Sequence, residues 1–407
     1  MITRKKKNAQ GGRQPLAGIK VLELARILAG PWAGQALADL GADVIKVESP
    51  AGDDTREWGP PYVARADGSL EAAYFHAANR GKRSIIADFK NKEHMVRLRH
   101  LIGEADVIVE NFKFGGLKKF GLDYESVKAL NPGVIYCSIT GFGQTGPYRN
   151  RAGYDFMIQG MAGVMDVTGD PDGEPQKVGV AVADIFTGLY AVIAIEAALI
   201  ERARTGLGAH IDMALFDCMT AVLANQAMNA LVSGTSPKRL GNAHPNIVPY
   251  QVFAVADGHV IIAVGNDRQF AALCDLIGLP ALITDPRFAT NPSRVDHRDT
   301  LIDILAPVIR LWTKADLLAS LEEKSIPGGP INTVGEVMAD PQIAARAMRI
   351  KVNDHTEHDD PDSPRDHTIP YLRLPLMIDG KPLVSDRPAP RLGEHDHETH
   401  FARKAKS

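Results

Sequence analysis

Short apolar runs alternate with segments of helical hydrophobic spacing along the first third of the chain. The apolar runs lie at 18–24, 42–48, 83–89, 106–112 and 133–140. Between them, apolar positions at 32–41 and 94–105 recur as they do on one face of a helix. Strands that alternate with helices predict an α/β fold built on a parallel, doubly wound sheet.

Ligands of such sheets bind beyond the carboxyl ends of the strands. Three loops that follow predicted strands are therefore candidates for a ligand site: ARILAGP at 25–31, ENFKFGG at 110–116 and ITGFGQTGP at 139–147. The last loop contains GFGQTG, a literal match to the G-x-G-x-x-G dinucleotide fingerprint. Because Pro147 follows at once and no apolar helical face comes after it, we interpret this segment as a glycine-rich loop and not as a nicotinamide site.

One carboxylate lies between two elements that both look buried. Asp184 follows the short β-branched run 178–183 and precedes a long apolar segment, Ile185–Arg204, that is predicted to be a helix. Since Asp is a preferred N-cap, one interpretation is a purely structural cap. The other is that the helix start keeps the Asp184 carboxylate ionised and oriented, as a nucleophile toward an activated acyl carbon requires. The local sequence leaves both interpretations open.

The composition changes to turn-forming residues at 235–249, which is the best linker candidate. A predicted β-hairpin about Asp257–Gly258 and several helical patterns follow. The expected organisation is a disordered tail at 1–14, the N-terminal part of a large α/β domain at 15–234, a small α+β domain at 235–330 and a return segment at 331–407 that completes the large domain. The polar stretch 353–366 is predicted to be an exposed loop.

The composition narrows the class of protein. The 407 residues are 45% hydrophobic and 23% charged with a net charge of −3, so there is no basic excess for nucleic acid. Three cysteines without a metal-site spacing are typical of a reducing compartment. The basic N-terminus lacks the apolar stretch of a signal peptide, and Glu196 interrupts the longest apolar run. We therefore expect a soluble, cytoplasmic protein with no membrane partner.

The C-terminal segment EHDHETH at 394–400 invites a metal-site interpretation, because His395 and His397 would face one way on a strand. The alternative is a solvated polar terminus. Nothing nearby in the sequence supplies the apolar scaffold that orients metal ligands, so no metal site is predicted here.

Taken together, the motifs resemble those of the class III coenzyme A transferases, the family of formyl-CoA and carnitine CoA-transferases. The stretches that carry the resemblance include LAGIKVLELARILAGPWAGQALADLGADVIKVESPAGDD, NRGKRSIIADFK, ADVIVENFKFGGLKKFGLDY, SITGFGQTGPY, GYDFMIQ, ERARTGLGAHIDMALFD, GNAHPNIVPYQVF, IPGGPINTVGEVMADPQ and LGEH. They occur in family order and cover roughly residues 15–400. So many ordered motifs are far more specific than any one of them.

The resemblance implies a Rossmann-like large domain, a small α+β domain, and a homodimer of two subunits interlocked like rings. It implies no metal and no permanently bound cofactor, since coenzyme A enters as an acyl-CoA substrate together with a carboxylic acid. Asp184 matches the family's catalytic aspartate. The implied route passes from the donor thioester to an aspartyl anhydride, then to an aspartyl-CoA thioester, and finally to the new acyl-CoA.

The family's CoA contacts carry over to residues of the first two loops and their surroundings. These candidate CoA-binding residues are Arg26, Ile27, Leu28, Ala29, Lys90, Asn111, Phe112 and Lys119. Lys90 and Lys119 are cations that suit phosphate, although solvated surface lysines would have the same local sequence. Ser49 stands where some members have an arginine for the adenosine end, so that contact does not carry over.

Tyr154, Asp155 and His244 are the candidate residues near the acyl group. Acyl-CoA racemases of the superfamily carry a G-H-D motif where this chain has Gly153-Tyr154-Asp155, and Tyr is a poor base at neutral pH. A transferase is therefore favoured, with an acyl-CoA racemase or epimerase and a non-catalytic acyl-CoA-binding protein as alternatives. The loop at 241–247 is polar, and an Arg and a His near the acyl end would suit a dicarboxylic acid, whose second carboxylate needs a cation. We therefore expect a C4–C5 dicarboxylate such as succinate as donor, with glutarate or a similar acid as acceptor.

Overall fold

The computed structural model describes residues 13–354, 367–398 and 400–401. They form two compact units. The large unit comprises the chain up to Gly163, Val178–Met228 and the chain from Gln342 onward, and the small unit comprises Val164–Lys177 and Asn229–Pro341. Residues 1–12 of the predicted tail lie outside the described residues.

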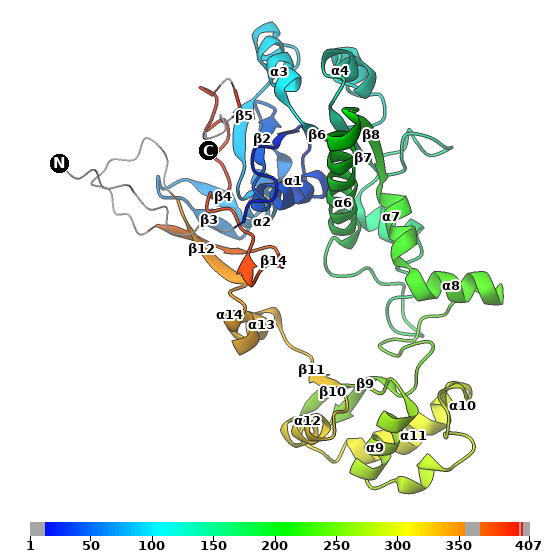
Figure 1. Cartoon of the computed structure of the whole chain (residues 1–407). Coiled ribbons are helices and arrows are strands. Elements are labelled where there is room, and N and C mark those ends of the chain that lie inside the picture. Colours follow the sequence, from blue (N-terminus) through cyan, green and yellow to red (C-terminus); the bar gives the residue numbers. More distant parts are fainter. Residues whose placement is uncertain (1–12, 355–366, 399, 402–407) are drawn as a thin grey trace. The chain divides into compact units, whose positions relative to one another are not determined.

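A six-stranded parallel sheet forms the centre of the large unit (Figure 1). Its strands are β1 (Lys20–Glu23), β2 (Asp43–Glu48), β5 (Arg83–Ile86), β6 (Val107–Glu110), β7 (Ile135–Thr140) and β8 (Ala209–Ala214). The spatial order is β5-β2-β1-β6-β7-β8, and every neighbouring pair is parallel. The predicted parallel sheet is confirmed. The order reverses direction between β1 and β6, so the loops after these two strands flank a crevice.

Helices cover both faces of this sheet because its strands bury both sets of alternating side chains. On one face, Leu22 and Ile108 share a core with Leu98 of α3 (Lys92–Glu104) and Val127 of α4 (Tyr124–Leu130). On the other face lie α1 (Ala29–Asp39) and α6 (Val182–Thr205), which pack against each other and against the strands. The site loops therefore start from elements that are fixed on both sides.

Shorter elements make up the rest of the large unit, and two of its helices, at 224–233 and 341–345, extend across its boundary with the small unit. The helices are α2 (Ala73–Asn79), α5 (Asp155–Met161), α7 (Leu215–Val222), α8 (Ala224–Ser233) and α14 (Pro341–Ala345), with single 3₁₀ turns η1 (Asp54–Arg56) and η2 (Lys118–Phe120). The strands are β3 (Tyr62–Ala64), β4 (Leu70–Ala72), β12 (Arg349–Asn353), β13 (Thr368–Leu372), β14 (Met377–Ile378) and β15 (Lys381–Pro382), and they form three antiparallel pairs.

The helix that carries Asp184 begins earlier than predicted. It runs from Val182 to Thr205, and its N-cap is Ala181, which has no side chain able to cap. The cap is supplied from α5, where Asp155 Oδ1 accepts a 2.7 Å hydrogen bond from Ala183 N. The prediction that Asp184 caps a helix starting at Ile185 is therefore wrong, because Asp184 lies inside the first turn.

A glycine lets α6 approach α1 closely. A Cβ atom at Gly188 would lie 2.7 Å from Ala29 O and 3.2 Å from the side chain of Trp32. Gly188 is one helical turn beyond Asp184, and Ala29 begins α1, directly after the loop that follows β1. This contact therefore sets the distance between the first candidate loop and the candidate nucleophile.

By length and composition alone, α6 is apolar enough to cross a membrane. This is weak evidence, because core helices of soluble proteins pass the same test, and Ala191 and Ile195 are buried in the large unit. The rest of α6 presents exposed apolar side chains at helical spacing, and α5 adds more beside them. We define this apolar face by Phe156, Met157, Met161, Leu189, Ile193 and Ile200.

The return segment packs more tightly than the sequence suggested. Asn353 ends strand β12, and Asp354 is fully buried and accepts a 2.7 Å hydrogen bond from Ala66 N. Of the predicted exposed loop at 353–366, Asn353 is exposed but belongs to strand β12, and the prediction of exposure is wrong at the buried Asp354. Residues 355–366 lie outside the described residues. A buried carboxylate with a backbone donor explains why a polar stretch begins inside the fold.

The segment EHDHETH is not a solvated terminus. His395 N donates a 2.9 Å hydrogen bond to Ser84 O at strand β5, and Asp396 accepts one of 2.7 Å from Ile86 N. Phe401, just beyond the segment, is buried in the core under α3. The sequence interpretation was wrong here because the scaffold for these polar residues is supplied by β5 and α3, about 300 residues earlier.

The small unit is an α+β structure. Its antiparallel sheet contains β9 (Tyr250–Val255), β10 (Gly258–Ala263) and β11 (Gly328–Pro330), so the predicted hairpin about Asp257–Gly258 is confirmed. Its helices are α9 (Asp267–Leu276), α10 (Asn291–Asp296), α11 (Arg298–Ile309), α12 (Lys314–Glu323) and α13 (Val334–Ala339), with the 3₁₀ turn η3 (Pro280–Ile283). Phe270 and Phe288 lie at the centre of its separate core.

Candidate active site

Asp184 lies in the wall of a cavity of about 410 Å³. The cavity opens where the loops after β1, β6 and β7 meet, at the reversal of strand order. The sequence-predicted residues in its wall are Arg26, Ile27, Leu28, Ala29, Asn111, Phe112, Lys119, Tyr154 and Asp184. These residues come from separate stretches of chain, and a cavity at such a crevice is the usual ligand site of this architecture. We therefore take it as the candidate active site.

The carboxyl group of Asp184 is poorly solvated. Burial, and secondarily the charge of Asp155, raises the pKa of Asp184 to about 7. The expectation that the helix start keeps this carboxylate fully ionised is wrong, because the loss of solvation outweighs the helix dipole. At neutral pH both protonation states are populated, and the ionised fraction is a more basic nucleophile than a solvated carboxylate.

Tyr154 and Asp155 occupy different places. Tyr154 is exposed in the cavity wall. Asp155 instead binds the start of α6 through Ala183 N and accepts a second 2.7 Å hydrogen bond from Gln159 Nε2. Asp155 therefore acts on the site indirectly, by holding the turn that carries Asp184 and by raising the pKa of that residue.

One amide side chain joins two loops of the cavity. Asn111 Oδ1 accepts a 3.0 Å hydrogen bond from Arg26 N, and Asn111 Nδ2 donates one of 2.7 Å to Arg26 O. This reciprocal pair links the loop after β6 to the loop after β1. The pair thereby fixes the backbone of Arg26. The guanidinium group of Arg26 lines the cavity and forms an exposed ion pair with Asp54 at 2.9 Å.

The next residue of this loop has an unusual backbone conformation. Ile27 has a φ of 70°, in the left-handed region that disfavours β-branched side chains. Its N–H group points at the buried carboxylate of Asp53, with distances of 3.2 Å to Oδ2 and 3.3 Å to Oδ1. Asp53 Oδ2 also lies 2.9 Å from Lys46 Nζ. The loop shape therefore depends on a buried ion pair.

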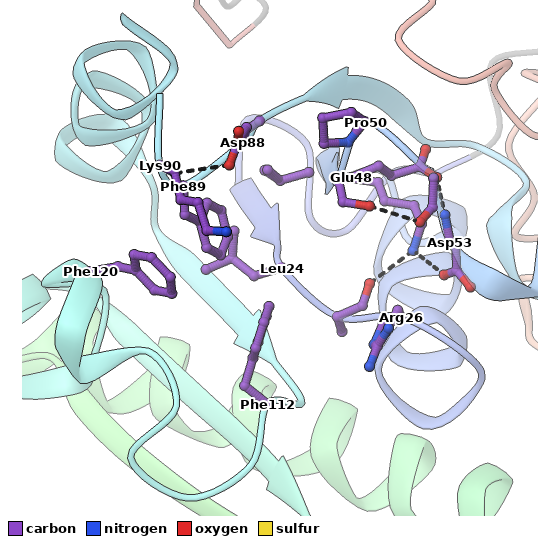
Figure 2. A pocket seen from close by; sticks show the side chains of 16 residues that line it. Leu24, Arg26, Glu48, Pro50, Asp53, Asp88, Phe89, Lys90, Phe112 and Phe120 are labelled. Carbon is purple, nitrogen blue, oxygen red and sulfur yellow. Dashed lines mark hydrogen bonds and ion pairs between the residues drawn. The ribbon is translucent and has the colours of Figure 1, made fainter. Parts of the chain in front are cut away.

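That ion pair belongs to a buried cluster beneath the loop, and Figure 2 labels one of its members, Asp53. Lys46 Nζ lies 3.2 Å from Glu23 Oε1 and donates to Ala25 O at 2.9 Å, and Lys82 Nζ lies 2.8 Å from Glu23 Oε2. Although burial opposes both shifts, the charge of Asp53 raises the pKa of Lys46, and Lys46 lowers the pKa of Asp53 to about 2. Two acids and two lysines thus lie in direct contact, and their formal charges balance.

A second cavity, of about 330 Å³, shares Arg26, Phe112 and Phe120 with the Asp184 cavity (Figure 2). The ring of Phe89 lies 6.0 Å from that of Phe112 and 5.3 Å from that of Phe120, so one wall is aromatic. Lys90 lies in this second cavity and not in the first. The predicted CoA-binding residues are therefore divided between two cavities that adjoin.

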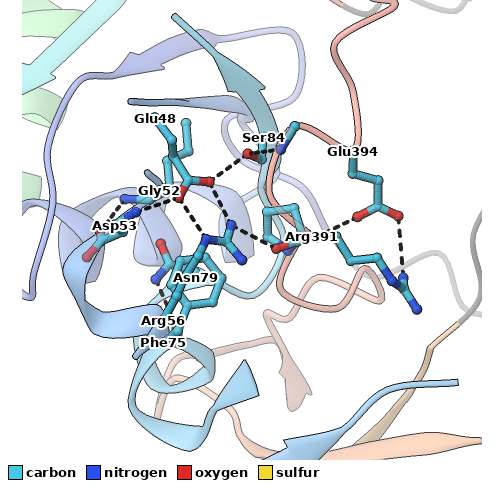
Figure 3. Close-up of polar contacts among 12 residues, drawn as sticks. Glu48, Gly52, Asp53, Arg56, Phe75, Asn79, Ser84, Arg391 and Glu394 are labelled. Carbon is cyan, nitrogen blue, oxygen red and sulfur yellow. Dashed lines mark hydrogen bonds and ion pairs between the residues drawn. The ribbon is translucent and has the colours of Figure 1, made fainter. Parts of the chain in front are cut away.

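Ser49 also lines the second cavity, and its Oγ donates a 3.2 Å hydrogen bond to Gly52 O. Behind it, Glu48 at the end of β2 binds Arg56 through two short hydrogen bonds of 2.6 and 2.8 Å (Figure 3). Ser84 Oγ donates to Glu48 at 2.6 Å and accepts from Gly393 N at 3.1 Å. The cavity wall is thereby connected to the return segment.

The sequence interpretation missed three cations in the wall of the Asp184 cavity: Lys113, Arg149 and Arg151. Arg149 lies over the ring of Phe114 at 5.0 Å, and Arg151 lies over that of Tyr148 at 3.9 Å. Within the described residues none of the three cations forms an ion pair. The sequence contained a signal for the two arginines, because the stretch YRNRAGYD places both of them shortly before the candidate substrate residue Tyr154.

The glycine-rich segment is a loop, as predicted, because the next helix begins only at Asp155. Gln144 N donates to the carboxylate of Asp212 at 3.0 and 3.1 Å. A Cβ atom at Gly141 would lie 2.6 Å from Gly153 Cα, so the two glycines allow their backbones to touch. The loop thus supports the segment that places Tyr154 in the cavity wall.

His244 belongs to the small unit. Its Nδ1 accepts a 3.1 Å hydrogen bond from Asn246 N, and its ring lies 5.2 Å from that of Tyr250. Burial and the charge of Arg298 lower the pKa of His244, so the imidazole is neutral at physiological pH. The structure therefore brings His244 together with polar neighbours of its own unit.

A cavity at the switch point of a parallel sheet, with a desolvated carboxyl group and unpaired cations, defines an α/β protein with a site for anionic ligands. The family description CoA-transferase family III matches residues 16–396. The chain therefore belongs to this family and is a class III CoA-transferase.

Known proteins similar to this chain include enzymes and a solved structure. The chain is 57% identical over 385 residues to the succinate–glutarate CoA-transferase of Agrobacterium fabrum, covering 94% of each chain. It is 40% identical over 386 residues to the succinyl-CoA:glutarate CoA-transferase of Homo sapiens, covering 94% of this chain and 84% of the human one. A crystal structure of a CaiB/BaiF family protein from Brucella suis matches with a TM-score of 0.81 and 61% identity, covering 95% of this chain and 98% of the other.

Proposed function

We propose that this enzyme transfers CoA from succinyl-CoA to glutarate or a similar C4–C5 dicarboxylic acid, with Asp184 as the nucleophile. The observation that carries the proposal is the position of Asp184 in the cavity where the predicted CoA-binding loops meet. The names of the relatives from Agrobacterium fabrum and Homo sapiens support the choice of acids.

The proposed reaction begins when the ionised Asp184 carboxylate attacks the thioester carbonyl of succinyl-CoA. A carbon–oxygen bond forms, the carbon–sulfur bond breaks, and a mixed anhydride and CoA thiolate result. The thiolate then attacks the aspartyl carbonyl and releases succinate, leaving an aspartyl-CoA thioester. Glutarate reverses these two steps and leaves as glutaryl-CoA. The raised pKa of Asp184 supports this role, because a basic carboxylate is a better attacking group.

Coenzyme A occupies both cavities in this proposal. The aromatic wall of Phe89, Phe112 and Phe120 suits the adenine ring, with Lys90 near its phosphates. The pantetheine arm passes along the loop from Arg26 to Ala29 and brings its sulfur atom to Asp184. Lys119, in the wall of the Asp184 cavity, binds a phosphate group. CoA is thus a substrate, and no resident cofactor is part of the proposal.

Arg149 and Arg151 are the proposed partners of the distal carboxylate of the acyl group. Both line the Asp184 cavity and have no ion pair within the described residues. A second carboxylate that leaves water needs a cation, and an arginine can hold it through two hydrogen bonds. Tyr154 contributes its hydroxyl group in the same wall. His244 stays a predicted residue for the acid, and its described contacts lie within the small unit.

The functional enzyme is proposed to be an interlocked homodimer in the cytoplasm. The apolar face on α5 and α6 supports a partner chain, because a soluble protein rarely leaves so many large apolar side chains in water. The three cysteines are free, in keeping with a reducing compartment. Light scattering at micromolar concentration tests the dimer, and a monomeric mass would contradict it.

The alternative is α-proton exchange on an acyl-CoA. It is less well supported, because the cavity holds Tyr154 at the position where the racemases of the superfamily carry a histidine. Incubation of the enzyme with succinyl-CoA and glutarate in D₂O separates the two reactions. We expect glutaryl-CoA without deuterium at the α-carbon, whereas deuterium uptake without exchange of acids would support the isomerase.

The nucleophile is tested by trapping. After incubation with succinyl-CoA, borohydride or hydroxylamine should modify Asp184 and abolish activity. Asp184→Ala should lose transfer by at least a thousandfold while remaining folded. Asp217→Ala is the matched control, because Asp217 is an exposed acid in the first turn of α7. Appreciable transfer by Asp184→Ala would refute the assignment.

A further inference from the structure

Three side chains converge near the C-terminal end of α3, away from both cavities. His100 Nε2 lies 2.8 Å from His400 Nδ1 and 3.1 Å from Glu104 Oε1, and His400 Nδ1 lies 2.9 Å from the same oxygen. In a tetrahedral zinc site with bonds of about 2.0–2.2 Å, the ligand atoms are about 3.3–3.6 Å apart. The three atoms lie 2.8–3.1 Å apart, so small outward rotations of the side chains would bring them to that spacing.

Hydrogen bonds alone satisfy this arrangement poorly. If both ring nitrogens carried protons toward Glu104, two N–H groups 2.8 Å apart would face each other. Since two such N–H groups would clash, at least one of the two nitrogens turns a lone pair toward the carboxylate oxygen, which also offers lone pairs. A metal ion accepts electron pairs from all three atoms at once, which removes this conflict.

Both halves of the cluster are held in place by the fold. His100 and Glu104 lie four residues apart on one face of α3, a 13-residue helix anchored by Leu98 and Leu101 in the core. His400 is fixed by its neighbour Phe401, which is only 3% exposed and packs in the same core. The ligands are therefore positioned before any ion binds, and binding costs little ordering.

The carboxylate of Glu104 is oriented by a neighbouring lysine. Lys20 Nζ lies 2.9 Å from Glu104 Oε2, so the other oxygen, Oε1, faces the two imidazoles. Outer hydrogen bonds of this kind hold the ligands of metal sites in natural proteins.

We infer that His100, Glu104 and His400 bind one divalent cation of the zinc type, with water as a fourth ligand. Two imidazoles and one carboxylate favour Zn²⁺ over Mg²⁺ or Ca²⁺, which prefer oxygen ligands. The ion joins α3 to the end of the return segment and stabilises the large unit without entering the reaction. Of the histidines in EHDHETH, it is His400 that binds the ion, and not His395 or His397.

The test uses the full-length enzyme after treatment with EDTA and dialysis. Zn²⁺ is titrated against a chromophoric chelator, and the wild-type protein should bind one ion per chain. His100→Ala and His400→Ala should each weaken Zn²⁺ binding at least tenfold. Glu104→Gln keeps the side-chain volume and should also weaken it. His397→Ala is the matched control, because it removes a histidine from the same segment, and it should bind Zn²⁺ as the wild type does.

A thermal melt provides the second measurement. Zn²⁺ should raise the Tm of the wild type and of His397→Ala, and it should leave the Tm of His100→Ala unchanged. CoA-transfer rates should be the same with EDTA and with Zn²⁺. The inference is overturned if His397→Ala loses as much affinity as His400→Ala, or if the His100 and His400 variants bind within twofold of the wild type.

Discussion

The carboxylate of Asp53 holds Ile27 in a left-handed backbone conformation. The N–H group of Ile27 lies 3.2 Å from Asp53 Oδ2, and its φ is 70°. Because Ile27 lines the Asp184 cavity and Asp53 does not, the shape of the candidate active site depends on an acid outside its wall. Lys46 keeps that acid ionised.

Asp53→Asn is therefore expected to destabilise the enzyme. Lys46 would remain buried without its strongest partner, which costs about 3 kcal/mol of the free energy of unfolding. The loop at Ile27 would relax, so the KM for acyl-CoA should rise. Denaturant unfolding and steady-state kinetics measure the two effects. The control is Asp54→Asn, whose half-exposed pair with Arg26 contributes less than about 1 kcal/mol. Equal destabilisation of the two variants would contradict this account.

A second prediction concerns the contact between α1 and α6. Gly188→Ala places a methyl group 2.7 Å from Ala29 O, so we expect a loss of about 1–3 kcal/mol in the free energy of unfolding and a lower transfer rate. Gly103→Ala in α3 is the matched control. No atom lies within 4 Å of its added methyl group, and alanine should stabilise that helix by about 0.5–1 kcal/mol. Chemical denaturation that ranks the two variants the other way would refute the prediction.

The pH dependence of the reaction follows from Asp184. The nucleophile must be ionised, and its pKa is raised to about 7 by burial and by Asp155. kcat/KM for succinyl-CoA should therefore fall about tenfold per pH unit below pH 7 and level off above it. Asp155→Asn removes the neighbouring charge, so the fall in kcat/KM should begin at a lower pH. A rate that stays constant from pH 5 to 8 would exclude Asp184 as the titrating group.

The same shift predicts that Asp184 costs stability. The unfolded carboxyl group has a pKa of about 3.8 and the folded one a pKa of about 7, so the folded state binds the proton more tightly. Stability is therefore lost as the pH rises from about 4 to 7 and is constant above. Asp184→Asn should raise the free energy of unfolding at pH 8 by about 1–2 kcal/mol, after allowance for solvent screening, and by almost nothing at pH 4. A destabilised variant at pH 8 would show that the native carboxylate is well solvated.

Sequence patterns placed the sheet and most of the cavity wall correctly. The loops after β1 and β6 meet because parallel strands end at one edge of the sheet, and that edge could be inferred from alternating elements alone. The residue that caps α6 could not be inferred in this way. Its acceptor, Asp155, comes from another helix, and a local rule that assigns the nearest acid selects Asp184 instead.

Lys46 shows a second limit of local patterns. It lies in the middle of strand β2, where a charged residue predicts a solvent-facing position, yet it is buried. Its partners Glu23 and Asp53 come from two other segments, so only the folded arrangement reveals them. The same holds for His400, whose partners on α3 lie about 300 residues away.

Added salt should affect the exposed cations of the cavity wall but not the buried charges beneath Ile27. Glu23, Lys46, Asp53 and Lys82 are almost completely inaccessible, so dissolved ions do not reach them. Lys119, Arg149 and Arg151 are exposed, and at a Debye length of about 8 Å their attraction for phosphate and carboxylate is screened. Added salt should therefore slow the capture of anionic substrates while the loop that receives them keeps its shape.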